Sequence, residues 1–165
     1  MYIKYEGDNL LVVLVYVDDI VFGCTNDSFV QWFANAMQSE FEMSIIGEFS
    51  IFLSLHIIQS SQGLFLSQEK YLKEMLKRFQ MEYSSDVSTP MVFGCKLSKD
   101  DPSPNVDQRT YQLMIGSLLY IIASSPDIMQ VVGMVGRFQF APKKTHLVDV
   151  KRIFKYLKGT MNYGL

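Results

Sequence analysis

Two neighbouring aspartates interrupt the most apolar stretch of the chain, and they constrain its fold more than any other feature. Residues 10–24 read LLVVLVYVDDIVFGC, in which Asp18 and Asp19 stand between two runs rich in Val, Ile, Leu and Tyr. Such runs are typical of buried β-strands. Because neighbouring residues on a strand point to opposite faces, both carboxylates can reach water only at a turn. The pattern therefore predicts a β-hairpin with its tip at residues 17–19.

Carboxylates at the tip of an apolar hairpin have two interpretations. Aspartate is common in solvated turns, because its side chain can hydrogen-bond to the turn backbone. Carboxylates also bind Mg²⁺, which takes one or two of them and completes its shell with water and substrate phosphates. Four-residue motifs match by accident, so residues 16–19 taken alone favour the solvated turn.

The composition excludes several classes of protein. The chain has 165 residues, 48% of them hydrophobic, and a formal net charge of −2, as expected of a globular protein with a substantial core. No apolar run has the length of a membrane span, and charged residues interrupt the first ten positions, where a secretory signal would lie. We therefore expect an intracellular protein, cytoplasmic or nuclear. Cys24, Cys95 and two distant histidines lack the spacing of a disulfide framework or a zinc site.

The rest of the chain combines short strands with amphipathic helices. Hydrophobic periodicity and capping residues predict strands at 1–5, 49–59 and 64–66, and helices ending near 41 and spanning 68–79, 107–124, 126–140 and 145–157. We expect Ser67, Asp107 and Ser125 to cap the helices that follow them, and Gly159 to end the last one. The last three helices are expected to pack as a bundle. The proline-rich stretch 81–106 predicts an irregular linker.

The helix predicted at 107–124 has a glycine in its middle. Its inward-facing residues are expected to be Tyr111, Met114, Ile115, Leu118, Leu119 and Ile122. Gly116 costs this helix about 1 kcal/mol relative to Ala. Close approach of another helix or of a ligand backbone would each explain it.

The C-terminal part of the chain is basic although the whole chain is not. Six Lys or Arg residues and one acidic residue lie between 143 and 158. Clustered basic residues on a helix can contact phosphates, and they can equally form an ordinary solvated helix face.

Several separated segments together match the pattern of one family. They are, in order, YVDDIVFG at 16–23, MQSEFEMSIIGE at 37–48, FLSLHI at 52–57, QEKYLKEMLKRF at 68–79, STPM at 88–91, YQLMIGSLLY at 111–120, SPDI at 125–128 and HLVDVKRIFKYLKGT at 146–160. In this order and spacing the chain resembles the reverse transcriptase of copia-type LTR retrotransposons, especially those of plants. The resemblance implies an α+β fold, with a partial polymerase palm at 1–66 and a mainly helical thumb and connection at 67–165.

The resemblance also implies roles for particular residues. Asp18 and Asp19 would be the catalytic carboxylates that hold Mg²⁺, or Mn²⁺, for nucleotide transfer to a primer 3′-hydroxyl, with Asp18 the direct ligand. Tyr16 and Val17 would lie near the primer end and the incoming dNTP. The RNA or DNA template–primer would contact a primer-grip-like segment at Phe52, Leu53, Ser54 and Leu55 and the further residues Gln112, Gly116, Tyr120, Lys151, Arg152 and Lys155.

The chain also departs from the family pattern. The third carboxylate of the two-metal site and the fingers lie upstream of the YVDD hairpin in the family, and only fifteen residues precede Tyr16 here. Family members continue toward an RNase H domain, and they commonly have Gly in place of Ser54 and Arg in place of Ser125. We therefore expect a polymerase fragment that is inactive alone, unless a separate chain completes it. The alternatives are a non-catalytic nucleic-acid-binding module and a decayed retrotransposon relic without activity.

Overall fold

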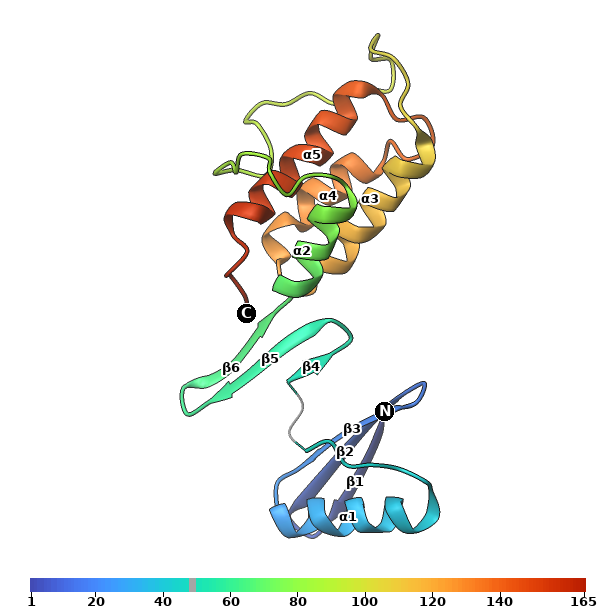
Figure 1. Ribbon diagram of the computed structural model, residues 1–165, viewed down its shortest axis with the longest axis vertical. Helices are drawn as coiled ribbons and strands as arrows, with labels where there is room; N and C mark the ends of the chain where they lie inside the picture. The colour runs from blue at the N-terminus through green and yellow to red at the C-terminus, as the bar shows by residue number, and fades with distance from the viewer. Residues whose placement is uncertain (48–49) are drawn as a thin grey trace. The chain divides into compact units, whose positions relative to one another are not determined.

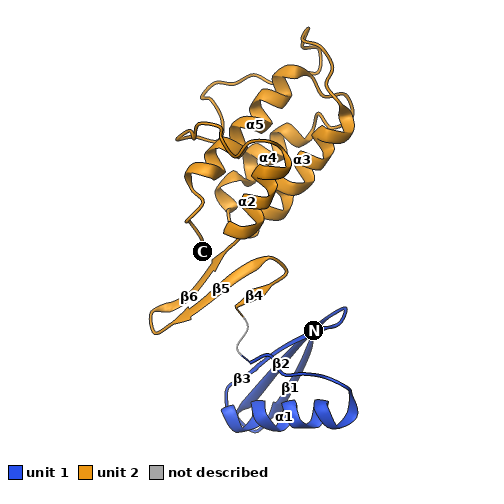
Figure 2. Ribbon diagram, viewed as in Figure 1, with its two compact units in different colours: residues 1–48 blue, residues 49–165 orange. Residues whose placement is uncertain are grey.

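The structure is a computed structural model that describes residues 1–47 and 50–165. The chain divides into two compact units, unit 1 at residues 1–48 and unit 2 at residues 49–165 (Figure 2). Each unit combines an antiparallel sheet with helices (Figure 1), so the fold is α+β, as the sequence predicts. The predicted division at residue 66 concerns polymerase subdomains, and it stays a prediction.

Unit 1 is a three-stranded sheet with one helix. Its elements are β1 (Tyr2–Glu6), β2 (Asn9–Tyr16), β3 (Asp19–Cys24) and α1 (Asp27–Glu40), and the strand order is β1-β2-β3. Tyr16 pairs with Asp19, so Val17 and Asp18 form a two-residue loop at the hairpin tip. The predicted hairpin is confirmed, with Asp19 already in the second strand.

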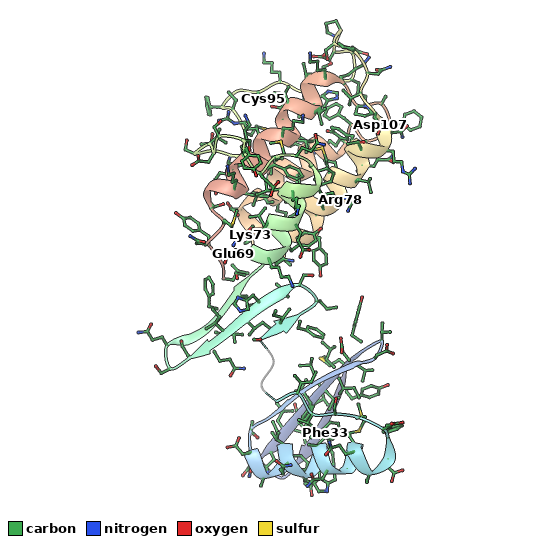
Figure 3. All side chains as sticks on the ribbon, viewed as in Figure 1. Phe33, Glu69, Lys73, Arg78, Cys95 and Asp107 are labelled. Carbon is green, nitrogen blue, oxygen red and sulfur yellow. The ribbon has the colours of Figure 1, made fainter. Side chains whose placement is uncertain are left out.

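Aromatic contacts hold α1 against one face of this sheet. Asn26 caps the helix, because its side chain accepts a hydrogen bond from a backbone N–H of the first turn. The Phe33 ring lies edge-on to Phe22 of β3, with 4.9 Å between the ring centroids (Figure 3). Phe33 is therefore partly buried between the helix and the sheet. Trp32 instead remains half-exposed, with the Lys4 ammonium 4.7 Å from its ring centroid.

The sheet of unit 2 contains one more reversal than predicted. Its strands are β4 (Ile51–Phe52), β5 (Leu55–Ser60) and β6 (Gly63–Ser67), in the order β4-β5-β6. The single strand predicted over 49–59 is wrong, because the chain reverses at Leu53 and Ser54. Their φ angles of 48° and 62° are left-handed, which is uncommon for residues other than glycine. Phe49, where that prediction begins, lies outside the described residues.

The helices of unit 2 share one hydrophobic core. They are α2 (Glu69–Arg78), α3 (Gln108–Ile121), the 3₁₀ helix η1 (Pro126–Ile128), α4 (Met129–Gly136) and α5 (Lys144–Gly159). The largest fully buried side chains come from α3, α4, α5 and η1, and they include Tyr111, Met114, Leu118, Ile128, Val132, Ile153 and Phe154. Leu72, Met75 and Leu76 of α2 join the same core, so the bundle also contains a helix that the prediction placed outside it.

The helix ends follow the sequence signals only in part. Asp107 caps α3 as predicted, and its Oδ2 accepts a hydrogen bond from the Thr110 N–H at 2.7 Å. The predicted cap at Ser67 is wrong, because the N-cap of α2 is Gln68. Ser125 is the N-cap residue before Pro126, as predicted, although its side chain makes no capping hydrogen bond. Gln68 itself is buried, and its Oε1 accepts a hydrogen bond from the Ser124 hydroxyl at 2.8 Å.

Three details of the last helices also differ from prediction. Leu119 is 55% exposed rather than in the core, because it lies beside the buried row of α3. The helix predicted to reach residue 140 ends at Gly136. Residues 137–139 instead donate backbone hydrogen bonds to the carbonyl oxygens three residues before them. Gly159 is the last residue of α5, and Thr160 is the C-cap.

The linker at 81–106 is irregular, as predicted, and both of its ends contact α5 or the residue that caps it. Residues 81–106 are all described, and an isolated bridge between Asn105 and Lys143 is the single piece of ladder among them. The Lys158 ammonium donates a hydrogen bond to the Ser84 carbonyl at 2.6 Å.

Within the described part of the chain, no helix is both long and apolar enough to cross a membrane.

Candidate functional site

The tip of the β2–β3 hairpin presents two carboxylates to solvent. Asp18 lies in the two-residue loop, Asp19 is the first residue of β3, and both are exposed. The preceding residue, Val17, is 81% exposed and has a φ of 52°. A left-handed conformation is unusual for a β-branched residue and costs about 1–3 kcal/mol. The tip is therefore a strained turn that carries two adjacent acidic side chains.

The carboxylates of the tip are suited to binding a hard cation. No hydrogen bond or ion pair of the Asp18 or Asp19 carboxylate is found among the described residues, and carboxylate oxygens are the ligands that Mg²⁺ takes. Across residues 1–47 and 50–165, no group of three or more His, Cys, Asp or Glu side chains is placed to hold a metal ion. The pair can thus supply one or two ligands, and further ligands would have to come from water, substrate or another segment.

The predicted primer-grip-like segment forms the reversal between β4 and β5. Phe52 pairs with Leu55, and Leu53 and Ser54 lie between them at the turn. The Tyr120 hydroxyl of α3 donates a hydrogen bond to the Leu53 carbonyl oxygen. The Tyr120 ring also contacts Tyr71 of α2, with 4.9 Å between the centroids. Tyr120 and Leu53 are distant in sequence and are both predicted to contact the template–primer. A hydrogen bond therefore connects them within unit 2.

One exposed face of α3 carries three residues that are predicted to contact the template–primer. Gln112, Gly116 and Tyr120 are all exposed, and each is four residues from the next. A Cβ placed on Gly116 would have no atom of the described chain within 4 Å. Packing against another helix of this structure is thus not the reason for the glycine. The Gln112 amide donates a hydrogen bond to the Gln139 carbonyl at 3.3 Å, which attaches this face to the end of α4.

The predicted basic residues of α5 do not all point freely into solvent. Lys151 is exposed and Lys155 is half-buried. The Arg152 guanidinium donates hydrogen bonds to Thr89, from Nε to the carbonyl at 3.1 Å and from Nη2 to the hydroxyl at 2.9 Å. Arg152 therefore holds the linker, while Lys151 presents its charge to the solvent.

A buried histidine that was not predicted as a site residue also fixes the linker. His146 is fully buried, and its ring stacks on Phe138 with 3.9 Å between centroids. Its Nδ1 accepts a hydrogen bond from the Lys143 N–H at 3.1 Å, so the ring proton is on Nε2, which donates to the Ser98 carbonyl at 2.9 Å. Helical spacing from Val150 was the sequence signal that could have revealed this residue as part of the core.

Cys95 and Asp149 form a second, partly buried contact between the linker and α5. The Cys95 thiol lies 3.6 Å from the Asp149 Oδ2 (Cys95 is labelled in Figure 3). Burial raises the pKa of the Cys95 thiol, and the neighbouring Asp149 carboxylate raises it further. Burial also raises the pKa of Asp149, against the opposing effects of Cys95, His146 and Arg152. Both shifts favour the neutral form relative to the free group, and a raised thiol pKa does not suit a nucleophilic cysteine.

Comparison with known proteins identifies the family. The family model described as reverse transcriptase (RNA-dependent DNA polymerase) matches residues 1–93, more than half of the chain. The chain belongs to the reverse transcriptase family. The matched region contains both aspartates of the hairpin tip, the β4–β5 reversal and α2.

Relatives of the chain include Pol polyproteins of plant copia-type retrotransposons. The chain is 33% identical over 95% of its length to the retrovirus-related Pol polyprotein from transposon TNT 1-94 of Nicotiana tabacum, and 31% identical over 100% to that from transposon RE1 of Arabidopsis thaliana. It spans 12% and 11% of the lengths of these two relatives. No solved structure gives a significant match. The predicted copia-type resemblance is confirmed.

Proposed function

We propose that this chain is the palm and thumb portion of a copia-type RNA-directed DNA polymerase, with the palm at 1–66 and the thumb and connection at 67–165. In this assignment Asp18 and Asp19 are catalytic carboxylates that hold Mg²⁺ or Mn²⁺, with Asp18 the direct ligand. Their exposure at a strained hairpin tip supports the assignment. The chemistry that the metal supplies in such polymerases is activation of the primer 3′-hydroxyl and neutralisation of the departing pyrophosphate.

The remaining residues are assigned to binding the template–primer and the dNTP. Tyr16 and Val17 directly precede the two aspartates and would lie near the primer end. The primer-grip-like turn at Leu53 would position the primer, and the exposed face around Gly116 would approach the sugar edges of the duplex. The observation that carries this proposal is the hydrogen bond from Tyr120 to Leu53, because it connects the turn and the α3 face within one unit. Substrates of this kind would place the chain inside the cell, in the cytoplasm or the nucleus.

We expect the isolated chain to bind the duplex without extending it. The described residues contain no group of three acidic or other ligands placed for a metal ion, and two-metal transfer needs more ligands than one carboxylate pair supplies. Binding would depend on salt, because Lys151 and Lys155 would displace counterions from phosphates. A non-catalytic nucleic-acid-binding module is therefore the second candidate function, supported by the open surface at Gly116.

The test combines primer extension with a binding measurement. Wild type and Asp18→Asn are compared on a labelled RNA–DNA template–primer with Mg²⁺ and dNTPs, and binding is followed by fluorescence anisotropy at two salt concentrations. Gly116→Leu is expected to weaken binding about tenfold, or about 1.4 kcal/mol, because its side chain fills the space that the duplex would occupy. Gly133→Leu is the matched control, since a Cβ on this helical glycine of α4 would also meet no atom within 4 Å.

The outcomes separate the three functions. Extension that disappears in Asp18→Asn would establish an active polymerase and overturn the expected inactivity. Salt-dependent binding without extension, weakened by Gly116→Leu alone, would support the binding module. Equal binding of the two glycine variants would remove the α3 face from the proposal, and no binding by wild type would favour a relic without activity.

A further inference from the structure

The linker at 81–106 is attached to α5 along most of its length. As the residue numbers of these contacts rise along the linker, they fall along α5 and its cap. The pairs are Ser84 with Lys158, Thr89 with Arg152, Cys95 with Asp149, Ser98 with His146 and Asn105 with Lys143. The linker therefore runs antiparallel to α5, and each part of it faces a definite turn of that helix.

Thr89 of the linker presents a hydroxyl group to a guanidinium. The Arg152 Nη2 donates a hydrogen bond to the Thr89 hydroxyl at 2.9 Å, and the Arg152 Nε donates to the Thr89 carbonyl at 3.1 Å. Thr89 is exposed and lies outside the helices and strands. These two bonds use two of the five N–H groups of the guanidinium. A group attached to the Thr89 hydroxyl would therefore begin in contact with a cation.

The charge of Arg152 has no carboxylate at ion-pair distance within the described residues. The salt bridges found there are Lys4–Glu6 and Lys73–Glu69. The acidic residue of α5, Asp149, is one turn before Arg152, and its Oδ2 accepts a hydrogen bond from the Cys95 thiol at 3.6 Å. Lys155 is one turn after Arg152, and residues three apart on a helix are neighbours. This part of α5 is therefore suited to an anion.

The residue after Thr89 gives it the local form of a kinase substrate. Pro90 lacks a backbone N–H and restricts the residue before it to extended conformations. Proline-directed protein kinases phosphorylate Ser or Thr that directly precede proline in exposed, irregular segments. Ser88 does not precede proline, and it lines a pocket with Asp86 and Tyr156. A phosphate on Ser88 would therefore share that pocket with a carboxylate, whereas one on Thr89 would face Arg152.

Two other serines precede proline, and neither combines exposure with a cationic partner. Ser103 is half-buried, its hydroxyl accepts a hydrogen bond from the Thr145 N–H at 3.3 Å, and its own N–H donates to the Asp101 carboxylate at 2.8 Å. Ser125 is half-buried at the start of η1. A phosphate on Ser103 would be close to the Asp101 carboxylate, which would repel it. Thr89 is therefore the site that the surroundings favour.

We propose that Thr89 is a phosphorylation site whose phosphate binds Arg152 and fastens the linker to α5. In the transfer, the Thr89 hydroxyl oxygen bonds to the γ-phosphorus of ATP held by a proline-directed kinase. The bond from that phosphorus to ADP breaks, and the hydroxyl proton passes to the base of the kinase. The phosphate adds about two negative charges and three acceptor oxygens, and charge-assisted hydrogen bonds are about twice as strong as neutral ones. The proposal does not depend on polymerase activity or on duplex binding.

The first experiment asks whether the folded chain accepts the phosphate at this position. The full chain is incubated with a proline-directed kinase and ATP, and the phosphate is located by mass spectrometry. One phosphate is expected on Thr89 in wild type and in the matched control Ser88→Ala, and none is expected at this position in Thr89→Val. Phosphorylation of Ser103 or Ser125 alone would overturn the proposal. So would phosphorylation of a synthetic peptide of residues 83–95 but not of the folded chain.

The second experiment asks whether the phosphate binds Arg152. The phosphorylated forms of wild type, Arg152→Gln and the control Lys151→Gln are titrated by ³¹P NMR, with circular dichroism as the check on folding. Lys151 is exposed on the same helix. The phosphate is expected to titrate about half a pH unit lower in wild type and Lys151→Gln than in Arg152→Gln, because the guanidinium favours the dianion. Equal titration in the three proteins would overturn the assignment of Arg152.

Amide hydrogen exchange supplies a readout of the linker itself. Phosphorylation of Thr89 is expected to slow exchange of the linker amides next to it about tenfold in wild type. The same modification is expected to leave their exchange unchanged in Arg152→Gln, because the phosphate then has no guanidinium to bind. Equal slowing in both proteins, or faster exchange in wild type, would contradict the attachment of the linker through Arg152.

Discussion

The two units differ in how much of their own sequence they bury. In unit 1 the buried hydrophobic residues are Leu11, Val13 and Ala34, whereas unit 2 has a core that extends through α2, α3, α4 and α5. Tyr5 and Leu14 belong to the sheet of unit 1 and remain exposed. A small sheet with one helix and so little burial is marginal by itself. The unit that carries the aspartate pair is therefore the one that supplies less of its own stability.

Separating the units should give the largest effect. A fragment of residues 49–165 is expected to keep its helical circular dichroism and to melt cooperatively, because its core lies within it. A fragment of residues 1–48 is expected to lack a cooperative transition. Cooperative melting of the shorter fragment would show that the unit 1 sheet is self-sufficient and would remove the contrast.

A cavity in the core of unit 2 should be nearly as damaging. Phe154 is fully buried and lies edge-on to Phe79, with 5.3 Å between centroids. Phe154→Ala is expected to lower the free energy of unfolding of the 49–165 fragment by about 3–5 kcal/mol in urea titrations. Val148→Ala on the same helix is the control, since Val148 is 60% exposed and its loss should change stability by less than about 0.5 kcal/mol. Similar effects of both changes would contradict the assigned core.

A single buried hydrogen bond should have a smaller effect. The Tyr111 hydroxyl is buried in the same core and donates to the Val135 carbonyl at 2.8 Å. Burial raises the pKa of Tyr111, so the hydroxyl keeps its proton. Tyr111→Phe is expected to cost about 1 kcal/mol in urea titrations, because it leaves that carbonyl without a donor. A stability equal to wild type would mean that water or another donor satisfies the carbonyl.

The smallest expected effect concerns pH. Because burial raises the pKa of Asp149 above its ordinary value of 3.8, the stability that its neutral form gives is fully present below that value. It is lost as the pH rises through the folded-state pKa. Asp149→Asn should therefore gain in unfolding free energy relative to wild type between pH 3 and pH 7. A difference that does not change with pH would show that Asp149 is ionised without cost.

The same substitution should change the reactivity of one thiol. The Asp149 carboxylate helps to raise the pKa of Cys95, so Asp149→Asn is expected to speed alkylation of Cys95 by iodoacetamide, measured on its peptide by mass spectrometry. Cys24, in unit 1, is the internal control, and its rate should stay the same. Equal acceleration at both cysteines would indicate general loosening of the fold.

Local patterns predicted much of this fold, and contacts between distant residues account for most of the errors. The β2–β3 hairpin and the Asp107 cap are set by neighbours in sequence, and both are confirmed. The reversal at Leu53 and Ser54 was missed because neither residue is a glycine. Gln68 was not expected to be buried, because its partner, Ser124, lies beyond the linker.

The candidate site shows the same division. The tip carboxylates follow from one short stretch of sequence, so their exposure could be predicted from Asp18 and Asp19 alone. The hydrogen bond between Tyr120 and Leu53 could not, because it joins a helix to a strand reversal on the other side of the linker. The roles of these residues came from the family resemblance, and they stay predictions.

The pairing of Leu165 with Leu66 has a consequence for the modular organisation of unit 2. The two residues exchange backbone hydrogen bonds, at 2.9 Å from the Leu66 N–H and at 3.0 Å from the Leu165 N–H, so they are antiparallel neighbours. A short turn ordinarily provides this relation in a hairpin. Here everything between them, from α2 to α5, takes the place of that turn. In topological terms the helical bundle leaves the three-stranded sheet at the end of β6 and returns to the same strand at Leu165. Replacing it with a different helical module is a route to redesigning the protein around an unchanged sheet.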